Sequence, residues 1–200
     1  MRDSMLREQK DKLMMPMADQ LFGAVHPNIL SITALGVGLL AAGAVAGQFY
    51  MAGLILWLFN RILDGLDGVV ARAHNKQSDF GGYLDLVLDF IVYLAIPIAL
   101  LFAQPTQANL WAGIILLAVY VLNLLSWTTL STLIEKRSLQ SANRLTSVEM
   151  PTGIVEGAET IVFYCLFILF PAYVPHLFIA MSILVLITAA QRVWWAYYNL

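Results

Sequence analysis

Charged side chains are scarce in this chain. Of its 200 residues, 12% are charged and 60% are hydrophobic, whereas a soluble domain carries about 25% charged residues. This shortage excludes an ordinary water-soluble domain and predicts an all-α integral membrane protein. The formal net charge is only −2, so the composition indicates no nucleic-acid partner.

Cysteine is almost absent as well. Cys165 is the single cysteine, so a disulfide within one chain is excluded. It lies in an apolar run, which argues against a reactive thiol. The first residues, MRDSMLREQKDKLMMPM, carry too many charges for a cleavable signal peptide. Internal repeats and low-complexity tails are also missing. We therefore expect one membrane domain over residues 1–200, with an interfacial helix in 1–26 and a helix bundle in 27–200.

What the chain does have is long apolar stretches. A helix that spans a bilayer needs roughly 20 apolar residues, and six stretches come close to that length. They run from Ile29 to Ala46, from near Phe49 towards Arg72, from near Phe80 to Phe102, from about Leu110 to Ile134, from Ile154 to Phe170 and from Leu177 to Tyr197. Three turns expected on one side of the membrane connect these spans in pairs, the first to the second, the third to the fourth and the fifth to the sixth. They are Gly47-Gln48, Gln104-Pro105-Thr106 and the segment between Pro171 and Pro175.

The basic residues predict the orientation of these six spans. None of the 11 lysines and arginines falls in the three turns, so the positive-inside rule places both termini in the cytoplasm. An even number of spans agrees with that. The segment Ser4–Val25 mixes charges with Leu, Met and Phe, which predicts an amphipathic helix on the inner leaflet. The alternative for this segment is a flexible tail.

Four aspartates carry most of the functional information. Asp64 and Asp67 are three residues apart near the inner end of the second span, and Asp85 and Asp89 are four apart near the start of the third. Each pair shares a helix face, and converging carboxylates repel each other unless they are protonated or bind a cation. Oxygen ligands without His or Cys favour Mg²⁺, Mn²⁺ or Ca²⁺. A proton or ion pathway is the alternative.

Small residues accompany the aspartates. Gly68, Ala71 and Gly81 would let a bulky ligand approach the backbone, and the planar guanidinium of Arg72 suits a phosphate. The combination indicates a diphosphate site. Small residues also serve helix packing in membranes, and packing is the role that we expect for the glycines of the first span, Gly36, Gly38 and Gly43.

The aspartate segment resembles the signature of the CDP-alcohol phosphotransferase family. That signature is D-x2-D-G-x2-A-R, then about eight residues, then G-x3-D-x3-D. The matching positions in this chain are Asp64, Asp67, Gly68, Ala71, Arg72, Gly81, Asp85 and Asp89. The resemblance extends to the layout, with an amphipathic start, six spans and the motif between spans two and three.

The resemblance implies an activity. Family members transfer a phosphatidyl-type group from a CDP-linked lipid, here expected to be CDP-diacylglycerol, to the hydroxyl of a small alcohol and release CMP. By this likeness the carboxylates of Asp64, Asp67, Asp85 and Asp89 hold Mg²⁺ or Mn²⁺, with two ions expected, and Asp89 is the general base. The residues expected to contact CDP are Asn28, Ser31, Gly68, Ala71, Arg72, Ser78 and Gly81.

The resemblance also implies a setting. The chain looks like a bacterial inner-membrane subgroup of this family, with a cytoplasmic active site and a homodimeric assembly. The acceptor alcohol stays open among glycerol 3-phosphate, inositol phosphate, serine and others. A membrane transporter using the same acids and a non-catalytic relative are the alternatives. A transporter predicts charges through the whole membrane depth, but here they gather near the inner end, which favours the enzyme.

The second half offers two candidate acceptor contacts. Arg137 and Arg144 lie in the basic loop Glu135–Met150 and would suit a phosphorylated acceptor, although such residues also set topology and touch anionic lipid. Glu156 and Glu159 share a helix face at the start of the fifth span. They either line the acceptor pocket or take part in helix packing.

Overall fold

The computed structural model describes residues 15–16, 25–140 and 153–200. The expected interfacial helix falls almost wholly outside these ranges, and Arg144 lies outside them as well.

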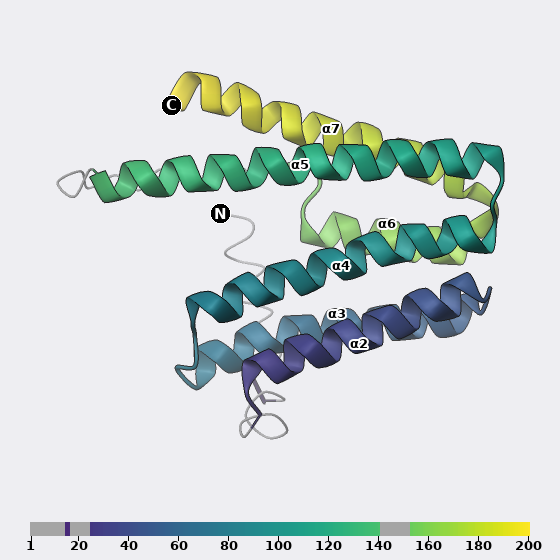
Figure 1. The fold of residues 1–200 in the computed structure, drawn as a ribbon, viewed down its shortest axis with the longest axis horizontal. Helices are drawn as coiled ribbons and strands as arrows, with labels where there is room; N and C mark the ends of the chain where they lie inside the picture. The colour runs from purple at the N-terminus through teal and green to yellow at the C-terminus, as the bar shows by residue number, and fades with distance from the viewer. Residues whose placement is uncertain (1–14, 17–24, 141–152) are drawn as a thin grey trace. The chain divides into compact units, whose positions relative to one another are not determined.

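The described part of the chain is built from α-helices and one short 3₁₀ turn (Figure 1). This confirms the predicted all-α class, and the described ranges hold six α-helices whose ends fall within a few residues of the expected spans, except at α5, which runs on to Gln140. The elements are α2 (Pro27–Ala46), α3 (Tyr50–Ala73), α4 (Asp79–Ala103), α5 (Gln107–Gln140), α6 (Gly157–Leu169), η1 (Pro171–Tyr173) and α7 (Val174–Asn199).

The helices differ in how apolar they are. Within the described ranges, four segments are long and apolar enough to cross a membrane: Pro27–Ala46, Asp79–Ala103, Gln107–Arg137 and Pro171–Asn199. α6 is apolar but shorter, with 13 residues. α3 is not among the four segments. Its second half, which we predict to lie near the cytoplasm, carries Arg61, Asp64, Asp67 and Arg72. The protein is therefore an integral membrane protein in which the long helix α3 carries four charged side chains in its second half.

The chain divides into two compact units, Met1–Ala103 and Gln104–Leu200. In the first unit α2 lies along both α3 and α4. A short connection between Ala73 and Asp79 reverses the chain, and Asn75 within it adopts φ 52°, a left-handed conformation that asparagine tolerates better than most residues. This turn brings the end of α3 and the start of α4, which carry the aspartates, into the same unit.

Close packing of α2 in the first unit depends on Gly38. A Cβ atom at Gly38 would lie 2.6 Å from both γ-carbons of Val92 on α4 and 3.0 Å from Nδ2 of Asn60 on α3. The packing role expected for Gly38 is therefore confirmed. A Cβ at Gly36 or Gly43 would meet no atom within 4 Å, so the same expectation gains no support at those two positions.

We predict that Gly38→Ala lowers the thermal stability of the protein in detergent, because overpacking of this kind costs about 1–3 kcal/mol. Gly36→Ala is the matched control on the same helix. It adds a methyl group in open space and should leave the melting temperature unchanged or slightly higher. Equal melting temperatures for the two variants would contradict the proposed packing of α2 against α4.

In the second unit α5 packs along α7. The ring of Phe167 on α6 meets Phe178 on α7 edge to face at 4.8 Å, and both side chains are fully buried. Nη1 of Arg192 donates to Oδ1 of Asn123 at 2.7 Å, which joins α7 to α5 with a polar contact.

Candidate active site

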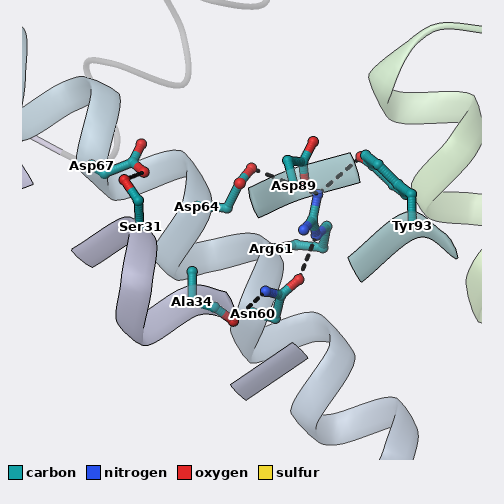
Figure 2. Close-up of polar contacts among 8 residues, drawn as sticks. All are labelled: Ser31, Ala34, Asn60, Arg61, Asp64, Asp67, Asp89 and Tyr93. Atoms are coloured by element: carbon teal, nitrogen blue, oxygen red, sulfur yellow. Dashed lines mark hydrogen bonds and ion pairs between the residues drawn. The ribbon is translucent and has the colours of Figure 1, made fainter. Parts of the chain in front are cut away.

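Asp67 is the most buried of the four aspartates. It is 4% exposed on α3, and its Oδ2 accepts a hydrogen bond of 2.6 Å from Oγ of Ser31 on α2 (Figure 2). A buried carboxylate needs hydrogen bonds or a cation to offset the loss of water. Ser31 supplies one such contact and fixes the direction of the Asp67 side chain.

Asp64 and Asp89 share an arginine. Nη1 of Arg61 lies 2.6 Å from Oδ1 of Asp89 on α4 and 3.6 Å from Oδ2 of Asp64, one turn further along α3 (Figure 2). The Arg61 side chain is 6% exposed, while those of Asp64 and Asp89 are 27% and 24% exposed. A fixed positive charge therefore lies between two of the four carboxylates.

A cavity of about 280 Å³ opens beside Asp67, close to the smallest volumes of about 300 Å³ that small-molecule sites have. All the residues expected to contact CDP line it, together with two of the four aspartates and four further residues. The lining consists of Pro27, Asn28, Ser31, Asp67, Gly68, Ala71, Arg72, Lys76, Gln77, Ser78, Gly81, Gly82 and Asp85.

Two glycines keep this cavity open. A Cβ at Gly81 would lie 3.0 Å from Oγ of Ser78 and 3.2 Å from Oδ1 of Asn28, and one at Gly68 would lie 3.2 Å from Nη1 of Arg72. Oγ of Ser78 also accepts a hydrogen bond from the backbone N–H of Gly81 at 3.0 Å. A larger residue at Gly81 would displace the side chains of Ser78 and Asn28, and one at Gly68 would displace that of Arg72.

Lys76 and Gln77 are lining residues that sequence reasoning missed. Both belong to the connection between α3 and α4. Lys76 could have been predicted from the sequence, because it lies four residues after Arg72 and a second cation suits a diphosphate.

A second, much smaller cavity lies among the carboxylates. It measures about 10 Å³ and its lining includes Arg61, Asp64, Asp85 and Asp89, which leaves room for about one water-sized group. Asp85 lines both cavities. The larger cavity and the carboxylate cluster are therefore adjoining parts of one site in the first unit.

The donor chemistry of this cluster fits a hard divalent cation, since carboxylate oxygens are the ligands that Mg²⁺ and Mn²⁺ prefer. Across the described ranges, however, no three His, Cys, Asp or Glu side chains are arranged around one ion position. Asp67 instead contacts Ser31, and both Asp64 and Asp89 contact Arg61. Ion binding by all four would require these side chains to exchange partners.

Glu156 and Glu159, in the second unit, form a helix cap. Glu156 is the N-cap of α6, and in a reciprocal capping box each glutamate side chain accepts a hydrogen bond from the backbone of the other. Oε2 of Glu159 accepts from the N–H of Glu156 at 3.1 Å, and Oε1 of Glu156 accepts from the N–H of Gly153 at 2.7 Å. Of the two roles left open, this geometry favours the structural one.

We propose this capping role and predict its consequence. Glu159→Ala should lower stability by about 1 kcal/mol, as loss of a helix cap does, whereas Glu159→Gln keeps an acceptor that a capping box can use. Glu159→Gln should therefore match the unsubstituted protein in melting temperature and in KM for its acceptor. A changed acceptor KM in Glu159→Gln, with stability unchanged, would support a pocket role instead.

Arg137 contacts the end of α7. Its Nη1 donates to the carbonyl of Asn199 at 3.1 Å and its Nη2 donates to the carbonyl of Leu200. A cation at the last carbonyls of a helix is favourable because of the helix dipole. Within the second unit, Arg137 thus has a structural contact besides the acceptor role that the sequence suggested.

Comparison with known proteins identifies the family. The family model for CDP-alcohol phosphatidyltransferase matches residues 24–196, which is most of the chain. The protein belongs to this family of phospholipid-synthesising transferases. Membership assigns it to an enzyme class and sets aside the transporter alternative.

Two relatives match most of the chain. It is 34% identical over 177 residues to inner membrane protein YnjF of Escherichia coli, covering 88% of this chain and 85% of that one. It is 30% identical over 175 residues to archaetidylinositol phosphate synthase of Pyrococcus horikoshii, covering 85% of this chain and 82% of that one.

One solved structure shows the same fold. It is the crystal structure of Mycobacterium tuberculosis phosphatidylinositol phosphate synthase with CDP-DAG bound, with a TM-score of 0.68 and 19% sequence identity. The match covers 91% of this chain and 92% of that chain. At this identity the likeness establishes the fold.

Proposed function

We propose that the protein transfers a phosphatidyl-type group from a CDP-linked lipid, CDP-diacylglycerol in the first instance, to the hydroxyl of a small alcohol. The observation that carries this proposal is the cavity of about 280 Å³, which gathers every residue expected to contact CDP beside Asp67 and Asp85. A cytidine diphosphate needs cations for its phosphates and close access to backbone, and this lining offers both.

The basic residues of the cavity would bind the diphosphate. Arg72 and Lys76 line it from the end of α3 and the following connection, and a guanidinium pairs with phosphate oxygens in a bidentate manner. Asn28 on α2 and Ser78 in the connection between α3 and α4 offer neutral polar groups. These contacts orient the donor so that its diphosphate lies towards the aspartates.

The transfer step follows from this placement. The acceptor oxygen attacks the phosphorus that carries the diacylglycerol, the bond from this phosphorus to the oxygen of CMP breaks, and CMP leaves. The proton of the acceptor hydroxyl passes to the carboxylate of Asp89, the proposed general base. This assignment places the base on α4, one turn after Asp85.

We propose that Asp64, Asp67, Asp85 and Asp89 hold Mg²⁺ or Mn²⁺, with two ions when the site is full. Divalent ions would neutralise the diphosphate and the leaving group. The four carboxylates and the small cavity beside three of them support this assignment.

The acceptor is proposed to be a phosphorylated polyol. Two of the similar proteins, the Pyrococcus horikoshii and Mycobacterium tuberculosis enzymes, are named as inositol phosphate lipid synthases, which supports testing inositol phosphate first. Arg144 and Arg137 are the candidate contacts for its phosphate. Glycerol 3-phosphate and serine are the next acceptors to test.

The setting proposed is a bacterial inner membrane, with both termini and the site on the cytoplasmic face and the protein as a homodimer. The Escherichia coli relative is named as an inner membrane protein, and the distribution of lysine and arginine supports the orientation. Cysteine-labelling of the two termini in sealed vesicles would test it.

Product analysis tests the function. The purified protein would be placed in liposomes containing CDP-diacylglycerol and Mg²⁺, each candidate acceptor would be added separately, and lipids would be examined by mass spectrometry. We expect one acceptor to give a new phospholipid whose mass equals the phosphatidyl group joined to that acceptor. No new lipid with any acceptor, from protein that binds CDP-diacylglycerol, would favour the non-catalytic relative.

A further inference from the structure

Arg61 pairs directly with two carboxylates of the four-aspartate cluster in the first unit. It contacts Asp89 at 2.6 Å and Asp64 at 3.6 Å, and it lines the same small cavity as Asp64, Asp85 and Asp89. The family signature begins at Asp64, so this arginine lies outside it, one helical turn earlier.

Several side chains fix the position of Arg61. Its guanidinium carbon lies 4.6 Å from the ring centre of Trp57 and 4.7 Å from that of Tyr93, and the two rings meet edge to face. Nη1 donates to the hydroxyl of Tyr93 at 2.9 Å (Figure 2). Stacking of this kind holds a desolvated cation in place.

Asn60 extends this support to α2. Nε of Arg61 donates to Oδ1 of Asn60 at 2.8 Å, and Nδ2 of Asn60 donates to the carbonyl of Ala34 at 2.7 Å (Figure 2). Groups from α2, α3 and α4 therefore hold the guanidinium beside the carboxylates. A cation fixed in this way cannot move into solvent without breaking several contacts.

The hydrogen bonds of Arg61 do not account fully for its burial. Nη2 is buried and has no hydrogen-bond partner among the described residues. Buried N–H groups that serve only the fold usually have such a partner. What Arg61 does provide is a full positive charge where Asp64 and Asp89 approach each other.

We propose that Arg61 is an internal counter-cation of the Asp64–Asp89 pair and competes with divalent ions for these two carboxylates. It thereby weakens ion binding at this half of the cluster. The inference rests on the proposed metal site but not on the transfer reaction. A divalent ion bound to Asp64 and Asp89 would lie close to the Arg61 guanidinium, and two positive charges that are close together in a low-dielectric site repel each other. Removal of the guanidinium charge should therefore strengthen ion binding.

The test measures Mn²⁺ binding to the detergent-solubilised protein, with free Mn²⁺ counted by electron paramagnetic resonance. We expect Arg61→Gln to bind Mn²⁺ at least about ten-fold more tightly, or to bind one ion more, because a unit charge beside the site is lost. Arg61→Lys keeps the charge and should stay close to the unsubstituted protein. Unchanged or weaker binding in Arg61→Gln would overturn the proposal.

The matched control is Arg192→Gln. Arg192 is also a buried arginine in a long helix, but its hydrogen-bond partner is Asn123. This variant should bind Mn²⁺ as the unsubstituted protein does. An equal gain in affinity in Arg192→Gln would show that the effect is general and would overturn a specific role for Arg61.

A second comparison covers the case in which Arg61→Gln does not fold. The single variant Asp89→Asn is compared with the double variant Arg61→Gln/Asp89→Asn. The double variant loses one positive and one negative charge, so it keeps the net charge of the native protein. The proposal expects tighter Mn²⁺ binding in the double variant, because Arg61 also faces Asp64. Equal or weaker binding would overturn it. No Mn²⁺ binding to the native protein would instead overturn the metal site itself.

Discussion

Asp89→Asn should reduce CMP release from CDP-diacylglycerol by about 1,000-fold, within the range of about 10²–10⁴ that general acid–base catalysis contributes. Asparagine keeps the size of the side chain but cannot take the proton of the acceptor hydroxyl. Asp89 lies outside the lining of the larger cavity, so binding of CDP-diacylglycerol should be affected little. The measurement is CMP release at saturating donor, together with the Kd for the donor.

Asp64→Asn provides the comparison for Asp89. Both side chains contact Arg61 and both line the small cavity, but Asp64 is proposed to act only as an ion ligand. We therefore expect its replacement to weaken binding of the donor in the presence of Mg²⁺ more than Asp89→Asn does. Equal loss of donor binding in the two variants would contradict this division of roles.

Asp67→Asn should have an effect of similar size for a different reason. Because an asparagine oxygen can still accept the hydrogen bond from Ser31, the substitution removes a charge with little change of shape. Ions that neutralise a reacting diphosphate contribute several kcal/mol, so kcat/KM should fall by about 1,000-fold. Mn²⁺ binding should weaken in the same variant.

Asp79→Asn is the control for Asp67→Asn. Asp79 is an exposed aspartate at the start of α4 and lines neither of the two cavities. Its replacement should leave both kcat/KM and Mn²⁺ affinity unchanged. Retention of full activity by Asp67→Asn, with the fold intact, would exclude Asp67 as an essential ligand.

The sequence predicted the helices and the members of the cavity well. The expected spans rested on apolar length, and the ends of α2 and α4 fall close to the expected residues. Gly68, Arg72 and Gly81 of the motif line one cavity, because the short connection between α3 and α4 keeps the end of one helix near the start of the other. Asn28, on α2, was expected in the same cavity from the family resemblance alone.

The partners of the aspartates could not be predicted in this way. The approach of Arg61 to Asp64 follows from their spacing of three residues, but its shorter contact with Asp89 depends on how α3 and α4 are aligned. Ser31 was expected among the CDP contacts, and it also donates to Asp67 from a third helix. Contacts between helices depend on packing that no local pattern reports.

The capping box at α6 was missed for another reason. The spacing of Glu156 and Glu159 is that of a capping box, but the pattern usually begins with serine, threonine, aspartate or asparagine. Two acids at a membrane helix were therefore interpreted as candidates for a binding pocket or for helix packing. Their contacts with backbone N–H groups explain how both acids are accommodated there.

The most direct test of the account is Mg²⁺-dependent formation of CMP by the purified protein. CDP-diacylglycerol and inositol phosphate would be supplied in detergent, and CMP would be measured with Mg²⁺, with EDTA and with Asp89→Asn. The account predicts CMP only with Mg²⁺, the acceptor and the native aspartate. CMP formed equally by Asp89→Asn, or formed equally in EDTA, would contradict the proposed site.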